Sequence, residues 1–233
     1  MRDSLDPDGC WRKHATPFAS AGEKAYETHV SWGLFQAARI KPGLGFGEAG
    51  PKQVRWAMSK QMANGWFASN SLSSLAEPHT HTIGYVLRCV IEAYRFAGEA
   101  DLLVAAELTA DALLKLIEPG GCLPGKLDGN WLPTVDWVCL AGNVQIGACC
   151  LLLYGLTGKA AYLDAARRAN QYVRRTVCLT GNPDVVGGVR GSFPVDGEYG
   201  RFEYLNWAAK FCIDSQLTEA FVDSQLPGAH NGR

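Results

Sequence analysis

Two acidic residues, Asp136 and Glu203, stand where a carboxylate could take part in catalysis. Asp136 lies in PTVDWVCLAGN and Glu203 in GRFEYLNW, each just before an apolar stretch and beside an aromatic residue. Glycoside hydrolysis needs two carboxyl groups, one to protonate the leaving oxygen and one to act as base or nucleophile. We therefore predict that Asp136 and Glu203 are catalytic. Capping of the following helix is the alternative for either residue taken alone. Other carboxylates in predicted loops are Asp128, Asp196 and Glu198, with Glu27 beside His29.

A lyase would use a different set of groups, because a Tyr or His base removes a proton while Asn or Arg neutralises a uronic carboxylate. Tyr204 is the predicted catalytic tyrosine. The residues that suit the other roles are Tyr199, Asn206, Arg190 and Arg201. We predict that Asn206, Trp137 and Trp207 bind substrate, the tryptophans by stacking on sugar rings. Core packing is the alternative for each Trp.

The stretch EPHTHTIGY places His79 and His81 just before an apolar stretch. A neutral imidazole serves near pH 7 as a base or as a metal ligand, and we predict that His81 is catalytic. An H-x-H pair without further ligands is a weak zinc signature, so we predict no metal and no cofactor. Helix capping by Thr80 or Thr82 is the structural alternative.

Three polar residues, His29, Tyr85 and Gln145, occupy equivalent positions when the apolar helices are aligned. One polar group per repeat, pointing the same way, is what a ring of substrate-binding residues requires. We predict that these three and Asn143 contact substrate. Bridging to a neighbouring helix is the alternative.

The elements that must position these residues form a repeat of helical hairpins. Tyr94 and Gly98 match Tyr154 and Gly158 about 60 residues later, each pair within a helix, glycine, helix pattern. A glycine supplies the positive φ that ends the first helix, and the i, i+3, i+4 spacing of Leu and Ala predicts the second. Each segment is therefore predicted to be an antiparallel αα-hairpin.

The loops between hairpins repeat as well. Their glycines are Gly9, Gly65, Gly121 and Gly188, and each loop leads to an apolar helix, at 26–39, 80–96, 139–156 and 204–217. Segments 102–116 and 162–175 carry charged faces instead, as outer helices do. Inner and outer helices alternating with a period of about 56–60 residues predict an all-α fold, the α/α toroid. An open α-solenoid is the rival architecture. Residues 1–233 are predicted to form one domain with a disordered tail at 222–233.

Several motifs resemble known toroids. The loops DPDGCW and QMANGWF are similar to the Gln/Asp-Gly-Trp loops of terpene cyclases and prenyltransferases, and GGVRGSF to a glycine turn of prenyltransferase β subunits. The motifs YETHVSWGL, THTIGYVLR, GNVQ and NWAAKFCID resemble a toroid family of bacterial and archaeal surface-polysaccharide gene clusters, which is grouped with six-hairpin glycosidases. This resemblance implies the toroid fold and a carbohydrate substrate or ligand. The sequence lacks the D-x-D-D acid of a terpene cyclase, so isoprenoid chemistry ranks third.

The chain is short for a closed ring. Six hairpins of about 56 residues would need more than about 300 residues, whereas 233 hold three hairpins and one further inner helix. We expect an incomplete barrel, either a shortened toroid or the C-terminal part of a longer one. Because an open repeat end exposes apolar surface, self-association or a covering partner is expected.

Composition narrows the partners further. The net charge is -1 and the 22 basic residues are scattered, which argues against nucleic acid. No signal peptide or membrane span is evident, and eight cysteines without a CxxC pair suggest reduced thiols, so we expect a cytoplasmic protein. We predict a carbohydrate-active enzyme of polysaccharide metabolism, of hydrolase or lyase type. A non-catalytic sugar-binding or scaffold protein of a polysaccharide assembly system is the alternative.

Overall fold

The computed structural model describes residues 2–16, 19–72 and 77–226. The chain divides into two compact units. Unit 1 comprises residues 1–112 and 127–134, and unit 2 comprises residues 113–126 and 135–233. Regular structure in the described residues is almost entirely helical, in agreement with the predicted all-α class.

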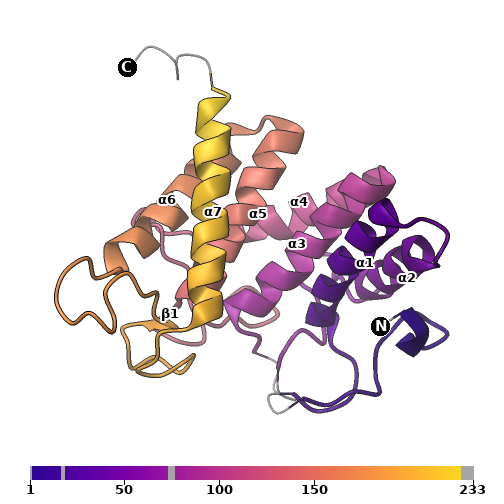
Figure 1. Cartoon of the computed structure of the whole chain (residues 1–233), viewed down its shortest axis with the longest axis horizontal. Helices are drawn as coiled ribbons and strands as arrows, with labels where there is room; N and C mark the ends of the chain where they lie inside the picture. The colour runs from indigo at the N-terminus through magenta and orange to yellow at the C-terminus, as the bar shows by residue number, and fades with distance from the viewer. Residues whose placement is uncertain (1, 17–18, 73–76, 227–233) are drawn as a thin grey trace. The chain divides into compact units, whose positions relative to one another are not determined.

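Unit 1 is built on two helical hairpins (Figure 1). Its elements are η1 (Arg2–Ser4), η2 (Ala25–Thr28), α1 (His29–Ile40), α2 (Phe46–Met58), α3 (Thr80–Ala97) and α4 (Ala100–Leu114), the last of which ends in unit 2. The buried ring of Phe35 on α1 holds the first three helices together. It stacks on Phe96 at 4.9 Å, and a Cβ at Gly50 would lie only 2.5 Å from it. A glycine at this point of α2 therefore allows the two helices of the first hairpin to approach closely.

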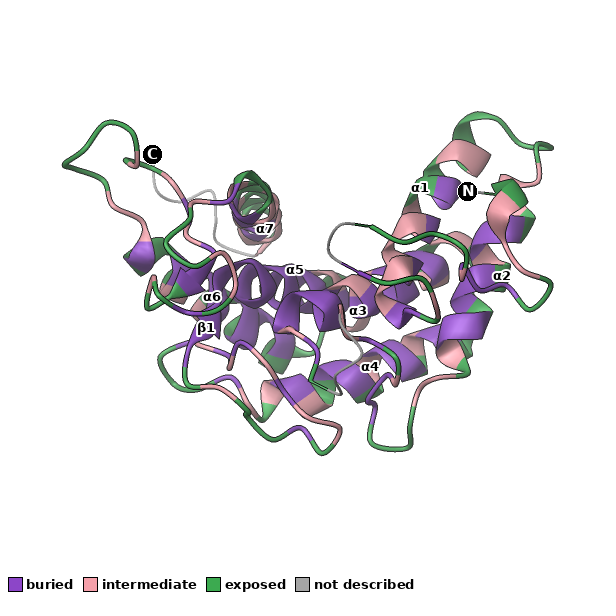
Figure 2. Ribbon diagram, turned by 90° about the horizontal axis from the view of Figure 1, so that it is seen from below, coloured by how far each residue is buried: buried purple, intermediate pink, exposed green. Residues whose placement is uncertain are grey.

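Unit 2 contains a third hairpin and one further helix (Figure 1). Its elements are β1 (Val138–Cys139), α5 (Leu140–Thr157), α6 (Ala160–Thr176), β2 (Ser192–Phe193) and α7 (Asn206–Ser224). Helix α5 packs against both α6 and α7 and is buried along most of its length (Figure 2). By length and composition alone α5 could cross a membrane, but 72% of it is buried within the protein, which is typical of a core helix.

The hairpin turns confirm the predicted glycine stops. Gly98 and Gly158 adopt φ values of 72° and 70° and close α3 and α5. Their N–H groups donate to the carbonyls of Tyr94 and Tyr154 at 2.7 and 2.8 Å. The matched Tyr and Gly positions thus have the same structural role in both hairpins.

Three of the repeated loops seat a glycine directly on the backbone of an outer helix. Gly9, Gly65 and Gly121 all have positive φ, and each N–H donates to the carbonyl three residues earlier at 2.8–2.9 Å. A Cβ on these glycines would lie 2.6, 2.7 and 2.0 Å from the carbonyl oxygens of Lys52, Leu108 and Arg168, on α2, α4 and α6 respectively. Both the backbone conformation and the close approach exclude a larger residue.

The fourth predicted loop copy, Gly188-Val189, is not equivalent to the other three. A Cβ at Gly188 would meet the ring of Tyr204 at 2.6 Å, not the backbone of an outer helix, and its φ is not positive. The chain just after it forms short β structure that the sequence did not predict. Arg190 pairs with Tyr204 in an isolated bridge, and β1 pairs antiparallel with β2, with Val138 opposite Phe193.

Trp66 packs between two loops of unit 1. It is only 5% exposed, and its ring meets Trp131 edge-on at 5.0 Å, while the Trp131 Nε1–H donates to the carbonyl of Asn64 at 2.9 Å. The two loops at 62–67 and 128–132 are therefore joined mainly by side chains.

Helix α7 is apolar on two opposite faces. Ala208, Cys212 and Ser215 are buried, whereas Ile213, Leu217 and Phe221 are exposed. The helix extends to Ser224, so it includes the first residues of the predicted tail, and residues 227–233 lie outside the described part of the chain. The expected self-association and the single-domain organisation stay predictions.

The seated glycines give a direct test of the repeat. We expect Gly121→Ala to lower the free energy of unfolding by more than about 3 kcal/mol, because a methyl group would overlap the Arg168 carbonyl at an unfavourable φ. The matched control is Gly120→Ala, whose added Cβ meets nothing within 4 Å. Urea unfolding of both variants measures the difference, and equal stabilities would contradict the seating role.

Candidate functional site

The N-terminal ends of α1 and α3 bring together imidazole and aromatic rings in unit 1. His29 lies against Tyr85 with ring centroids 4.5 Å apart, and Tyr85 meets His81 edge-on at 5.6 Å. His79 continues the row, 5.4 Å from His81. The predicted residues His29, His81 and Tyr85 therefore do converge, in what we call the imidazole cluster (His29, Trp32, His79, His81 and Tyr85).

Trp32, a member of this cluster, and Arg88, its neighbour, were not predicted. Trp32 meets His29 edge-on at 5.8 Å, and the Arg88 guanidinium lies over the Trp32 ring at 4.1 Å. Arg88 Nε also donates to the buried carboxylate of Glu92 at 2.9 Å. Helical spacing was the signal available in the sequence, since each of the two follows a predicted residue by three positions, Trp32 after His29 and Arg88 after Tyr85.

His81 is the most enclosed member of the imidazole cluster. Burial, together with the nearby His79, lowers the pKa of His81 to about 3, so its imidazole is neutral at pH 7. A neutral imidazole accepts or donates a proton through different ring nitrogens, as a base or a hydrogen-bonding group requires. Thr82 Oγ1 donates to the carbonyl of His79 at 2.8 Å, which ties the start of α3. Among the residues that the structure describes, no group of three or more potential metal ligands lies together.

In unit 2 a small backbone ladder joins the loop segments that contain the predicted carboxylates. The Leu140 N–H donates to the Gly191 carbonyl, and the Gly191 N–H donates to the Glu203 carbonyl, both at 3.1 Å. Asp136 lies two residues before β1, and both carboxylate residues are exposed. We call these loop segments, residues 135–139 and 189–207, the loop platform. Asp136 does not immediately precede a helix as predicted, because β1 lies between it and α5.

Aromatic side chains accompany the carboxylates on the loop platform. Trp207 is 44% exposed, and its Nε1–H donates to the hydroxyl of Tyr199 at 2.8 Å, which fixes the indole. Ser192, which the sequence did not single out, holds Tyr199 in turn through two hydrogen bonds to its backbone. Tyr204 accepts a hydrogen bond from Arg190 Nε at 3.2 Å. The exposed residues of these segments also include Phe193, Phe202 and Asn206.

Two predicted substrate-binding residues are buried against the protein backbone. Asn143 is completely buried; it accepts from the Leu123 N–H at 2.9 Å and donates to the carbonyls of Gly121 and Ala169. Its amide joins the glycine loop to α6 and is fully occupied. Trp137 is also buried, with its ring against the backbone of Gly125, where a Cβ would lie 2.3 Å away.

Gln145 presents the opposite situation on the same helix. Its side chain is only 6% exposed, yet neither its amide oxygen nor its amide nitrogen has a hydrogen-bond partner among the described residues. A buried amide without partners costs free energy, and such groups in folded proteins are nearly always satisfied by protein, water or ligand. Because an amide both donates and accepts, a hydroxyl-bearing ligand would satisfy it.

Comparisons with known proteins bear on the fold. No family model matches the sequence, and no curated protein matches it. Solved structures do match, among them an unsaturated glucuronyl hydrolase from Bacillus sp. GL1, with 13% identity and a TM-score of 0.73 over 100% of this chain and 68% of that one. A UGL variant with the saccharide dGlcA-Glc-Rha-Glc matches with 12% identity and a TM-score of 0.72, over the same shares of both chains. A D-mannose isomerase matches with 12% identity and a TM-score of 0.65, over 95% of this chain and 66% of that one.

These likenesses confirm the predicted fold class. The matched proteins are six-hairpin glycosidase-like α/α toroids, and this chain aligns with about two thirds of their length, as an incomplete toroid does. The fold is shared by glycoside hydrolases and by sugar isomerases and epimerases. At such identities the comparison establishes the fold alone, and chemistry must be argued from side chains.

The contrast between Gln145 and Asn143 predicts opposite effects on stability. Gln145→Met should raise the free energy of unfolding of the ligand-free protein by about 1–3 kcal/mol, because it removes an unpaired buried amide. Asn143→Leu should lower it by about 3 kcal/mol or more, because backbone groups at 121 and 123 lose their partners. Denaturant unfolding of both variants tests this, and a loss of stability in Gln145→Met would show that its amide is satisfied.

His81 predicts a specific acid sensitivity. A folded-state pKa near 3 against an unfolded value of about 6.5 means that the unfolded chain binds the proton first. Stability from this group is complete above pH 6.5 and falls by roughly 1.4 kcal/mol per unit as the pH drops from there toward 3. Unfolding curves at several pH values should show this slope, flattened in His81→Gln and retained in a His14→Gln control at an exposed imidazole. The same slope in both variants would disprove the assignment.

Proposed function

We propose that this chain is an enzyme of polysaccharide metabolism that binds an oligosaccharide on the loop platform and hydrolyses a glycosidic bond there. The observation that carries the proposal is that backbone hydrogen bonds join the loop segments of Asp136 and Glu203, whose carboxylates are exposed, and that the segment of Glu203 also carries the exposed indole of Trp207. Aromatic faces stack on sugar rings, and paired carboxyl groups perform the acid and base steps of glycoside hydrolysis.

In the proposed reaction one carboxyl group donates its proton to the glycosidic oxygen as the bond to the anomeric carbon breaks. The other carboxylate either takes a proton from the attacking water or forms a glycosyl ester that water then opens. One water molecule is consumed for each bond, and both carboxyl groups end in their starting states. The likeness in fold to a hydrolase structure that carries a saccharide supports a carbohydrate as the ligand of this chain.

A second candidate chemistry is proton transfer at a sugar carbon, of lyase or isomerase type, in the imidazole cluster of unit 1. It is favoured by the neutral, buried imidazole of His81 and by the hydroxyl-bearing Tyr85 ring 5.6 Å away. This chemistry would require His81 and would not require Asp136.

The hydrolase proposal is tested by Asp136→Asn and Glu203→Gln. Each substitution should reduce kcat on a cleaved oligosaccharide by at least about a hundredfold, because it removes one of the two proton-transfer groups. Neither should change the thermal midpoint appreciably, since both side chains are exposed. Release of reducing ends from a panel of bacterial polysaccharides measures the activity.

The matched control is Asp164→Asn, which removes an exposed carboxylate on α6 that pairs with Arg168. It should leave turnover unchanged. Activity that survives both platform substitutions but disappears in His81→Gln would transfer the reaction to the imidazole cluster. Binding of a glycan without turnover in the unsubstituted protein would show a binding module.

A further inference from the structure

We infer that unit 1 contains a second carbohydrate subsite, a pocket that accepts one uncharged sugar ring. The pocket has a volume of about 260 Å³ and is lined by Ser4, Trp11, His14, Glu27 and Val30. All five residues belong to unit 1, and none is part of the loop platform. Sites for drug-sized ligands run to about 300–1,000 Å³, so this pocket suits a smaller ligand such as a single ring.

The lining of this pocket has an apolar part, Trp11 and Val30, and a polar wall, Ser4, His14 and Glu27. Trp11 packs with Leu34, Ala49 and the partly buried Val30. This largely buried indole gives a sugar ring an apolar contact.

The polar wall is organised by a buried lysine. Lys24 is only 5% exposed, and its Nζ donates to Glu27 Oε1 at 2.8 Å and to the His14 carbonyl at 3.2 Å. Both acceptors belong to residues that line the pocket, so the ammonium group fixes that wall. An ammonium group has three N–H donors and a carboxylate has several acceptor positions, so capacity of both kinds exceeds these two bonds.

This arrangement selects the charge of the ligand. The charges of Lys24 and Glu27 cancel within the wall, so a ligand with its own charge would bring an unbalanced charge into a partly enclosed site. Sugar hydroxyls both donate and accept, and they carry no charge. A neutral hexose ring therefore fits better than a uronate or an amino sugar.

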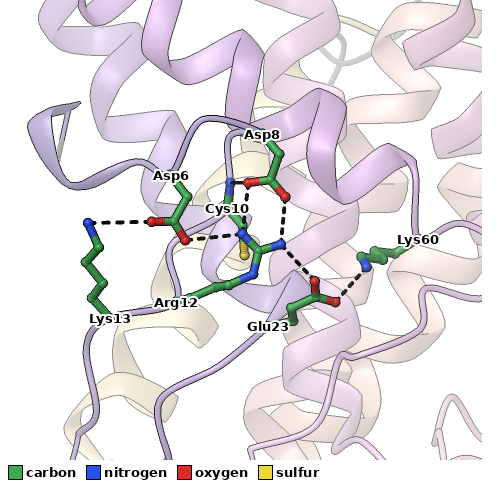
Figure 3. Close-up of polar contacts among 7 residues, drawn as sticks. All are labelled: Asp6, Asp8, Cys10, Arg12, Lys13, Glu23 and Lys60. Carbon is green, nitrogen blue, oxygen red and sulfur yellow. Dashed lines mark hydrogen bonds and ion pairs between the residues drawn. The ribbon is translucent and has the colours of Figure 1, made fainter.

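The pocket depends on an N-terminal segment that carries a network of ion pairs. Ser4, Trp11 and His14 all come from residues 2–16, whose regular structure is limited to the short η1. Arg12 pairs with Asp6 and Asp8 in this segment and with Glu23, which in turn pairs with Lys60 after α2 (Figure 3).

The basic partners in this network lower the pKa values of two of its carboxylates. The Arg12 guanidinium holds the pKa of Asp8 well below its usual range. Lys60 and Arg12 together lower the pKa of Glu23. Since the Arg12 network positions three residues of the pocket without lining it, loss of Arg12 should weaken binding indirectly.

The inference is tested by titrating the full chain with methyl glycosides of glucose, galactose and mannose. At least one should bind with a stoichiometry of one by calorimetry and change the tryptophan fluorescence. Methyl glucuronide and glucosamine, which are charged, should bind at least tenfold more weakly. Failure of all three neutral glycosides to bind, or equal binding of the charged sugars, would overturn the inference.

Variants locate the binding site. Ser4→Phe, which fills the pocket, and Glu27→Gln should each weaken binding at least tenfold, and Arg12→Gln should weaken it at least threefold. Circular dichroism checks that Glu27→Gln remains folded, and Ser4→Phe tests the site without disturbing the Lys24 pair. Asp136→Asn and Trp207→Ala should leave this binding unchanged, which separates the pocket from the loop platform even where no hydrolysis is found. Binding that is lost in Trp207→Ala and kept in Ser4→Phe would refute the pocket.

Discussion

The architecture depends on the contact of three loop glycines with the backbone of outer helices. Gly9, Gly65 and Gly121 each bring the chain against a carbonyl of α2, α4 or α6, closer than any side chain permits. A loop seated in this way fixes where its outer helix lies and how the following chain departs. After Gly65 and Gly121, that chain leads to the N-terminal ends of α3 and α5. The candidate catalytic and binding residues lie near these helix ends because the loops hold them there.

On α5, the hydrogen-bond partners of a side chain, and not its residue type, distinguish a structural role from a candidate binding role. Asn143 and Gln145 carry the same functional group, lie two positions apart and are both buried. The amide of Asn143 is saturated by the backbone of the glycine loop and of α6, whereas the amide of Gln145 meets no partner among the described residues. An amide that is fully bonded within the fold stabilises it and cannot reorganise around a ligand. The unsatisfied amide of Gln145 destabilises the ligand-free protein and would gain hydrogen bonds from a bound ligand.

The helices were predicted well from the sequence because buried helix faces give a periodic spacing of apolar residues, and because a glycine marks the end of a helix locally. Gly98 and Gly158 end their helices as expected, and His29 meets Tyr85 as the aligned register implied. Long-range hydrogen bonds leave no such record: the partners of Asn143 lie 20 or more residues away. The same limit explains the error at Gly188, where the loop motif is present but Tyr204, not an outer helix, is its neighbour.

The two candidate sites differ in how far their proposed catalytic groups are buried. His81 is buried and needs no further cover to remain neutral, whereas Asp136 and Glu203 are exposed to water. Hydrolytic carboxyl groups work best where water is limited, so the loop platform would gain from a covering surface. Helix α7, which begins at the platform, carries the exposed apolar side chains of Ile213 and Leu217.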